Sequence, residues 1–173
     1  MDDQSTEQRR KVSCSSAAQD RNIQLWSLDR VSRTSLEIKR MMGSWKPDLL
    51  NRLFQPYGDN DEYWVLPYEL RKTLWDETKL LDQAICRNTF DYDDFVIKAK
   101  DRMNSWARDT LRTYGYSVLF GIIFGNAQQG TRAYNWYLSH DMRSLMFFDA
   151  QTGIEYTSAA LDEFGFEPTF AMF

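Results

Sequence analysis

The sequence predicts an α+β fold in which N-terminal helices pack on a mainly antiparallel β-sheet. Up to about residue 110, apolar residues recur every three or four positions, which is the spacing of amphipathic helices. After Gly115, short apolar runs are separated by turn-forming segments at 140–143 and 151–153, which is typical of strands. Because the helices come first and the strands follow as a meander, we expect an antiparallel sheet rather than alternating βαβ units.

The composition predicts a packed core and no strong electrostatic partner. The chain has 173 residues, of which 43% are hydrophobic and 15% aromatic, and its net charge is −4. We expect a polar tail at 1–20 and a single domain at 21–173. The small charge argues against a nucleic-acid or anionic-membrane partner, and the longest apolar run, 118–125, is far shorter than the ~20 residues of a membrane helix. Cys14 and Cys86 make no disulfide framework, which indicates a reducing, cytoplasmic compartment.

Three helical segments are expected before residue 84. The first runs from Asp20 to about Met42 and ends at Gly43, the second follows Pro47, and the third spans 67–83. The first segment carries several basic residues that form either a solvated helix face or a contact strip for a partner. These residues are Arg30, Arg33, Lys39 and Arg40.

A fourth helix is expected to begin at Tyr92. Asp91 can cap it, and Asp93 and Asp94 lie in its first turn, where the helix dipole favours negative charge. Its apolar residues recur at 4-3-4-3 spacing and predict a stripe that faces the strands. The stripe comprises Tyr92, Val96, Ala99, Met103 and Trp106. A cysteine at position 92 would lie where thiolates are stabilised, but tyrosine stands there.

The strands are expected at 116–124, 132–139, 145–150 and 154–157. The first of them is apolar on both faces and should lie in the middle of the sheet. The aromatic segment that follows, EFGFEPTFAMF, either packs on the domain or supplies contacts to a partner at 164–173.

Two segments resemble a known family. FDYDDFVIKAKDRM resembles the nucleophile helix of papain-like cysteine hydrolases of the mushroom agglutinin C-terminal-domain type, where an aromatic-x-Cys-Asp-x-Phe signature places the cysteine at a helix start. TRAYNWYLSHDMRSLMFFDAQTG resembles the second signature of that family, a His-Ala-x-Asn strand followed by an acid-Pro-Gln-Thr-Gly turn. Small phage and bacterial proteins share the pattern, so the resemblance implies a phage-encoded protein of the host cytoplasm or the virion.

The resemblance implies a site that has lost its chemistry. Tyr92 stands at the nucleophile position, Arg132 at the general-base position and Asp149 at the position of the orienting acid, with Asn135 and Gln151 as neighbours. A phenol with a pKa of ~10 is a weak nucleophile without a base, and arginine cannot accept a proton. A non-catalytic domain that serves as a structural or protein-interaction component is therefore expected. The opposing interpretation is that no ancestral site existed and Tyr92 is a core tyrosine.

Two other functions remain open from the sequence. A cysteine hydrolase or transferase would have to use Cys86 with His140, the only histidine. A nucleic-acid accessory protein would use the basic helix at 21–42. No cofactor or metal site is expected, because Asp59, Asp61 and Glu62 read as a solvated turn rather than a calcium loop. The expected partner is a protein or larger assembly that contacts residues 1–42 and 164–173.

Overall fold

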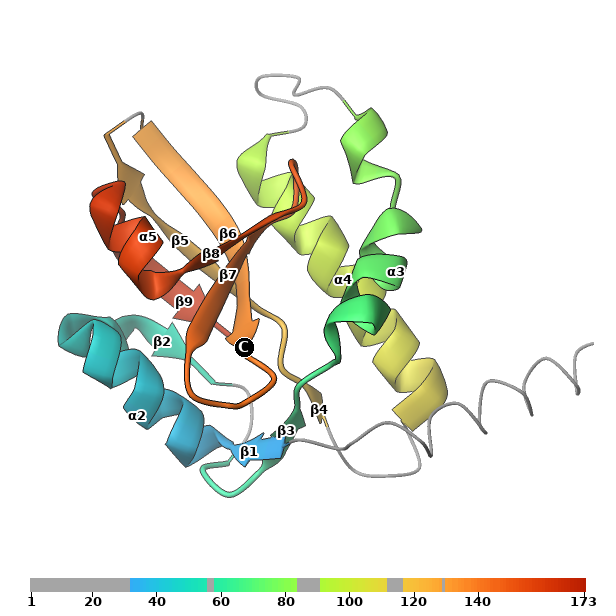
Figure 1. Ribbon diagram of the computed structural model, residues 1–173. Coiled ribbons are helices and arrows are strands. Elements are labelled where there is room, and N and C mark those ends of the chain that lie inside the picture. Colours follow the sequence, from blue (N-terminus) through green and yellow to red (C-terminus); the bar gives the residue numbers. More distant parts are fainter. Residues whose placement is uncertain (1–31, 56–57, 84–90, 112–116, 129) are drawn as a thin grey trace, which may run out of the picture. The chain divides into compact units, whose positions relative to one another are not determined.

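A six-stranded sheet forms the centre of the structure (Figure 1). The structure is a computed structural model, and it describes residues 32–55, 58–83, 91–111, 117–128 and 130–173. The strand order is β2-β9-β5-β6-β7-β8, and a smaller sheet has the order β1-β3-β4. The strands are β1 (Ser32–Thr34), β2 (Leu53–Phe54), β3 (Glu62–Trp64), β4 (Ser117–Val118), β5 (Gly121–Ala127), β6 (Gly130–Leu138), β7 (Leu145–Asp149), β8 (Ile154–Thr157) and β9 (Glu167–Met172).

Helices cover both faces of the larger sheet (Figure 1). Helices α3 and α4 pack on one face, while α2, η1 and α5 pack on the other. The helices are α2 (Ser35–Trp45), the 3-10 helix η1 (Pro47–Arg52), α3 (Tyr68–Asp76), the 3-10 helix η2 (Leu80–Asp82), α4 (Tyr92–Leu111) and α5 (Ser158–Glu163). The expected α+β class is confirmed, but the sheets are mixed, because β2 runs parallel to β9 and β3 runs parallel to β4.

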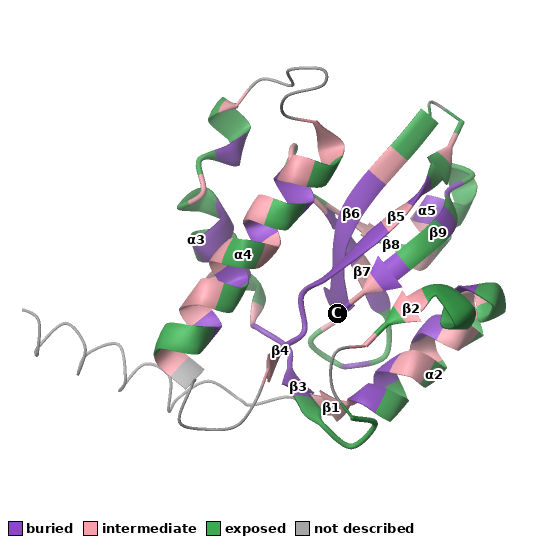
Figure 2. Cartoon of the chain, turned by 180° about the vertical axis from the view of Figure 1, so that it is seen from behind, coloured by how far each residue is buried: buried purple, intermediate pink, exposed green. Residues whose placement is uncertain are grey.

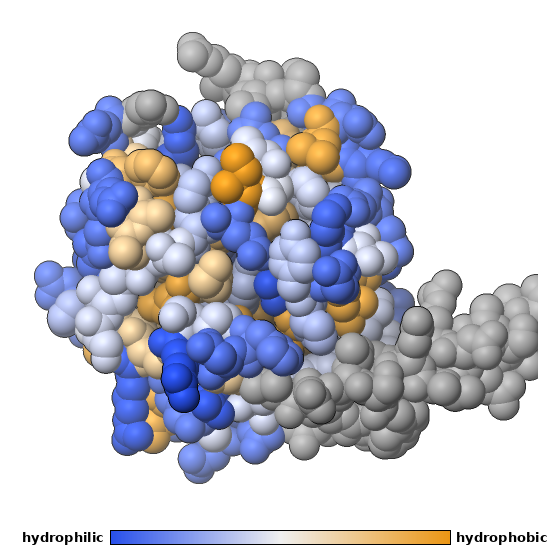
Figure 3. Space-filling model, viewed as in Figure 1, coloured by the Kyte–Doolittle hydropathy of each residue, from blue (hydrophilic) through white to orange (hydrophobic). Residues whose placement is uncertain are grey.

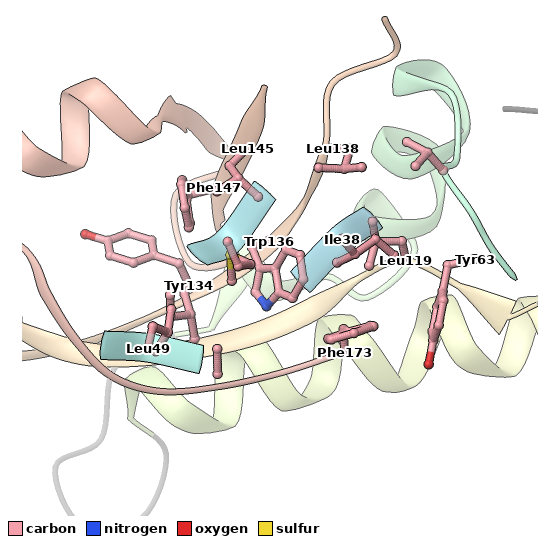
Figure 4. Close-up of a cluster of buried hydrophobic side chains, with 14 of the residues drawn as sticks. Ile38, Leu49, Tyr63, Leu119, Tyr134, Trp136, Leu138, Leu145, Phe147 and Phe173 are labelled. Atoms are coloured by element: carbon pink, nitrogen blue, oxygen red, sulfur yellow. The ribbon is translucent and has the colours of Figure 1, made fainter. Parts of the chain in front are cut away.

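Strand β6 lies at the centre of the core. Its residues from Ala133 to Leu138 are all buried, because side chains alternate between the two covered faces (Figure 2). Tyr134, Trp136 and Leu138 point into the cluster built on α2 and η1 (Figure 4). Asn135, on the opposite face, contacts α4. The strand therefore connects the two helical layers.

The expected helix over 20–42 is confirmed for residues 35–42 and wrong for residues 32–34. Residues 32–34 form β1, which pairs with β3, and α2 begins only at Ser35. Thr34 imposes this start through a reciprocal capping box: the backbone N–H of Glu37 donates to Thr34 Oγ1, and the Thr34 N–H donates to Glu37 Oε2. Gly43 does not end the helix, which continues to Trp45. Residues 1–31, which include the expected polar tail, lie outside the described residues.

The expected helix over 67–83 is interrupted. Helix α3 ends at Asp76, and Lys79 adopts a left-handed conformation with φ of 56° before the short turn η2. A left-handed residue cannot continue a right-handed helix. The break also directs Leu80 into the core, where it is 1% exposed.

The strand expected at 116–124 is split in two. Val118 belongs to β4 in the small sheet, and β5 begins at Gly121 in the large sheet. The Leu119 N–H donates to Trp64 O at the break, and the Phe120 carbonyl accepts from Lys100 Nζ at 2.8 Å. The ammonium of Lys100, on α4, thus supplies a hydrogen-bond donor to a backbone carbonyl that pairs with no neighbouring strand in the described ranges.

The C-terminal segment is part of the sheet. Strand β9 lies between β2 and β5, and Phe166, Ala171 and Phe173 are buried. The alternative in which 164–173 packs on the domain is therefore confirmed for most of the segment, because its backbone is paired on both sides. Helix α5, which the sequence analysis missed, precedes it and is capped by Thr157, whose Oγ1 accepts from the Ala160 N–H.

Candidate functional site at the start of helix α4

Helix α4 begins at Tyr92, where the sequence placed it. The backbone N–H of Asp91 donates to Asp94 Oδ2 at 2.9 Å, and the Asp94 N–H donates back to Asp91 O at 3.1 Å. This local cap fixes the helix start, and Asp93 adds negative charge near the positive end of the dipole. Tyr92 is therefore held in the first turn, at the rim of the sheet.

The apolar stripe of α4 faces the sheet, with its ends less covered than its middle (Figure 2). Val96, Ala99 and Met103 are at most 1% exposed. Tyr92 and Trp106 are half-buried, and Trp106 packs against Trp64 with ring centroids 6.1 Å apart. The stripe is thus confirmed as the packing face, whereas full burial of its two terminal aromatic residues is not found.

Tyr92 and Arg132 meet. The guanidinium carbon of Arg132 lies 4.4 Å from the ring centroid of Tyr92, within the range of a cation–π contact. Arg132 extends from the start of β6, where Nη1 donates to Thr131 O at 3.3 Å. Two residues that are 40 positions apart in the sequence thus meet at the start of α4. An aromatic ring and a permanent cation are in contact there.

Asp149 lies at the end of β7 and organises the following turn. Its Oδ1 accepts from the backbone N–H of Gln151 at 2.9 Å and from that of Thr152 at 3.3 Å. The Gly153 N–H completes the turn by donating to Asp149 O, and Gly153 supplies the φ of 74° that the turn requires. Gln151 therefore takes part through its backbone. These hydrogen bonds give the Asp149 carboxylate a turn-forming role.

Tyr134 interacts electrostatically with both Asp149 and Arg132, and the sequence analysis did not identify it. It lies two residues after Arg132, on the same face of β6, and the alternation of the strand could have found it. The pKa of its hydroxyl is raised, first because the group is buried and then because Asp149 is negative, while Arg132 acts to lower it. Both charged side chains are thus close enough to act on this phenol.

Asn135 has a structural role next to the site. It is fully buried, and its Nδ2 donates to Val96 O of α4 at 2.9 Å and to Gly121 O of β5 at 3.2 Å. Its Oδ1 has no hydrogen-bond partner among the residues that the structure describes. Through these two hydrogen bonds Asn135 fixes α4 against the sheet.

A second polar cluster, which we call the Arg71 cluster, consists of Arg71, Tyr137 and Glu155. Arg71 is 9% exposed, donates to Leu66 O and forms an ion pair with Glu155 at 3.2 Å. Its guanidinium carbon lies 3.9 Å from the ring centroid of Tyr137, whose hydroxyl donates to Glu155 Oε1. Burial is the main reason that the pKa of Tyr137 is strongly raised. No local pattern in the sequence predicts this cluster.

The other candidate residues do not assemble into a site. His140 is exposed in the turn after β6, at the opposite end of this strand from Arg132, and Cys86 lies outside the described residues. Of the basic strip, Lys39 forms an ion pair with Asp59 at 2.8 Å. In the described ranges, no group of three or more His, Cys, Asp or Glu could hold a metal ion. In the same ranges, no helix combines the length and apolar character needed to cross a membrane.

Comparison with known proteins places these positions in a family. The family model described as "Agglutinin C-terminal" matches residues 63–155. This chain belongs to the agglutinin C-terminal family. The matched part of this agglutinin C-terminal domain contains Tyr92, Arg132 and Asp149, and it ends at Glu155 of the Arg71 cluster. No curated protein matches the chain.

Solved structures share the fold. A lectin of Polyporus squamosus, bound to the epitope Neu5Acα2-6Galβ1-4GlcNAc, has a TM-score of 0.72 at 24% identity, over 82% of this chain and 49% of the lectin. A structure described as "PSL1a-E64 complex" has a TM-score of 0.70 at 24% identity, over 82% of this chain and 51% of its own. The chain thus spans about half the length of these proteins, and the likeness concerns the fold.

Proposed function

We propose that this chain is a non-catalytic binding domain that keeps the frame of a papain-like cysteine hydrolase site. Membership of the agglutinin C-terminal family supports a binding or interaction role. The observation that carries the loss of chemistry is the contact of Arg132 with the Tyr92 ring, at 4.4 Å, at the helix start. The nucleophile and base positions of the family pattern face each other there, and neither holds a group suited to the reaction.

The two replacements act in the same direction. Tyrosine keeps an aromatic ring at the helix start, but its phenol is a weak nucleophile without a base. Arginine stays charged and offers only donors, so it cannot take a proton from a nucleophile. The pair stabilises the junction of α4 and β6 through the ring and the cation, and its arginine cannot act as a general base.

Restoring the two groups tests this proposal. In a Cys14→Ser/Cys86→Ser background, Tyr92→Cys with Arg132→His should give a thiol that iodoacetamide alkylates at pH 6 at least tenfold faster than the thiol of Tyr92→Cys alone. The helix start and a neighbouring imidazolium both stabilise a thiolate. Mass spectrometry gives the rate at position 92. Equal rates in the two variants would contradict the placement of Arg132 at the base position.

Activity of the unaltered chain provides the second arm of the test. We expect no thiol-dependent hydrolysis of casein or of fluorogenic peptide amides. The variants Cys86→Ala and His140→Ala should behave like the unaltered chain in the same assays. A hydrolysis that iodoacetamide abolishes in the unaltered protein, and that is lost in Cys86→Ala, would overturn the proposal. Such a result would assign the chemistry to Cys86.

A phage-encoded role as a virion component is the finer part of the proposal. Its support is the resemblance of the Tyr92 and Arg132 segments to small phage and bacterial proteins. Purified virions of the source phage should then contain the chain at a constant copy number, measured by quantitative mass spectrometry. Recovery of the chain from the host cytoplasm alone, with none in virions, would restrict the role to the infected cell.

A further inference from the structure

A pocket of about 40 Å³ lies between α3, α4 and the β7–β8 hairpin, away from the start of α4. Neither Tyr92 nor Arg132 lines it. Its walls combine aromatic rings with three charged side chains. The residues that matter for recognition are Tyr68, Arg71, Lys72, Trp75, Phe148 and Glu155. Nothing in the family pattern of Tyr92, Arg132 and Asp149 accounts for this arrangement.

The walls of the pocket are held in place by contacts within the protein. Arg71 is fixed by Leu66 O and Glu155, as described above. The indole N–H of Trp75 donates to Ala150 O at 2.9 Å, and its ring meets Phe148 edge-on with centroids 5.4 Å apart. Gly153 leaves room for this indole, because a Cβ there would lie 2.3 Å from Trp75 Cη2. A pocket with fixed walls loses little entropy on binding.

Each charged side chain that lines the pocket already has a partner of opposite sign. Arg71 pairs with Glu155 at 3.2 Å, and Lys72 pairs with Asp76, which lies outside the pocket lining, at 3.0 Å. A cation or an anion in the pocket would therefore have to compete with an existing ion pair for its counter-charge. A neutral ligand avoids this competition. The charged groups can still donate and accept hydrogen bonds with such a ligand.

Hydrogen-bonding capacity remains at one wall, and an exposed aromatic ring also lines the pocket. Glu155 Oε1 accepts from both Arg71 and Tyr137, whereas Oε2 accepts no hydrogen bond in the described part of the chain. The side chain of Glu155 is 27% exposed, so a ligand can reach it. Tyr68 is 51% exposed, so its ring can pack against a flat ligand that also reaches the carboxylate.

We infer that this pocket binds the edge of a neutral pyranose, a sugar unit with hydroxyls on its rim and C–H groups on its face. One hydroxyl donates to Glu155 Oε2, and the C–H face packs on Tyr68, where the electron-rich ring attracts it. A cavity of 40 Å³ has room for about three water molecules, so only one edge of the ring enters. With so few buried atoms, the dissociation constant should be roughly millimolar.

Probes of three charge types separate the ligand classes. The 15N-labelled full chain is titrated with the methyl glycosides of galactose, glucose, mannose and N-acetylglucosamine, with tetramethylammonium chloride and with sodium benzoate. At least one glycoside should give saturable shifts of the Trp75 indole and Arg71 guanidinium signals, and the two ions should not. Saturation by an ion instead, or no saturation by any glycoside up to 50 mM, would overturn the inference.

Two variants locate the binding. Tyr68→Ala should weaken the best glycoside at least fivefold, and Glu155→Gln should weaken it as well, because an amide oxygen accepts less strongly than a carboxylate. Phe54→Ala is the matched control: this aromatic ring is 52% exposed, close to the 51% of Tyr68, and lies on β2. Unchanged affinity in Tyr68→Ala, or equal loss in Phe54→Ala, would place the sugar elsewhere.

The inference rests on the proposed binding role but can fail separately from it. Failure of all glycosides removes the pyranose pocket and leaves the alkylation result at position 92 untouched. Thiol-dependent hydrolysis by the unaltered chain removes the non-catalytic role and leaves the titration unaffected. The alkylation reports on position 92 and the titration reports on the pocket, so a failure can be assigned to one of the two proposals.

Discussion

Two arginines of this domain lie over tyrosine rings, and their surroundings differ. Arg71 lies 3.9 Å from the ring centroid of Tyr137 and is buried, while the side chain of its carboxylate partner Glu155 is 27% exposed. Arg132 lies 4.4 Å from the ring centroid of Tyr92, and both of these residues are only half-buried. The same contact therefore has a different weight in the two places. A buried cation depends on every partner, whereas a half-exposed one is partly solvated by water.

Loss of the Arg71 guanidinium should have the largest effect on stability. Arg71→Met keeps the apolar stem but leaves Glu155 and the Tyr137 hydroxyl without their cation, so the free energy of unfolding should fall by about 3 kcal/mol. Urea unfolding followed by fluorescence measures the change. In Arg71→Met/Glu155→Leu the loss should be smaller, because no uncompensated charge remains. A loss below about 1 kcal/mol in the single variant would contradict the contrast with Arg132.

Lys100 extends the comparison, because it is a largely buried cation hydrogen-bonded to the carbonyl of Phe120. Burial lowers the pKa of its ammonium from 10.5 to about 8. Between these values the unfolded chain binds a proton that the folded chain has released, so stability should rise as the pH increases from 8 to 10.5. The rise is at most roughly 3 kcal/mol, at about 1.4 kcal/mol per pKa unit.

Lys100→Met should remove most of this rise, while Lys98→Met, on the same helix, controls for the loss of a lysine. The measurement is the urea midpoint at several pH values from 7.5 to 10.5. Below pH 8 both states of the unaltered chain are protonated, so the slope should vanish there. An unchanged slope in Lys100→Met would show that other groups cause the pH dependence.

Removal of one hydroxyl from the Arg71 cluster should have a moderate effect. Tyr137→Phe keeps the ring under Arg71 and its stacking on Phe120, with centroids 5.8 Å apart, but removes the donor to Glu155. We expect a loss of about 1.5 kcal/mol, as for a hydrogen bond to a charged acceptor. Tyr92→Phe is the corresponding change in the other pair and should cost clearly less. Equal losses in the two variants would remove the distinction drawn here.

Arg132→Met should have the smallest effect, about 0.5–1 kcal/mol, which is the size of a cation–π contact at a partly exposed site. Thermal unfolding of this variant and of Arg71→Met under the same buffer gives a direct comparison. Because surface contributions are screened by salt, the effect of Arg132→Met should shrink further at 0.5 M NaCl. An effect as large as that of Arg71→Met would show that the α4 start is a stability centre.

The sequence predicts those features that depend on near neighbours. The start of α4 at Tyr92 was predicted because a cap and a repeating apolar stripe lie within one segment. The approach of Arg132 to Tyr92 was expected from the family resemblance, which relates two distant segments. By contrast, Arg71 and Glu155 are 84 positions apart, and each reads alone as an ordinary charged surface residue. Only the packing of α3 on the β7–β8 hairpin brings them together.

Conformations imposed from a distance were equally hard to foresee. Lys79 ends the α3 region with a positive φ although no glycine or proline marks the break. The strand over 116–124 is divided because Leu119 bonds to Trp64 and Phe120 bonds to Lys100, and both partners lie in other elements. Thr34 and Glu37, by contrast, form a capping box whose spacing is visible in the sequence. The apolar spacing over 20–42 predicts one continuous helix, whereas the capping box makes the helix begin only at Ser35.

The position of β9 has a consequence for the order in which the molecule is built. Leu53 of β2 pairs with Ala171 of β9, so the sheet joins segments that are more than a hundred residues apart. A ribosome has to complete residue 172 before β5 gains its second neighbour and β2 its only one. Until then, the hydrogen-bonding edge of β5 is open to other chains. Such long-range closure slows folding, and it makes the nascent chain a substrate for chaperones during this interval.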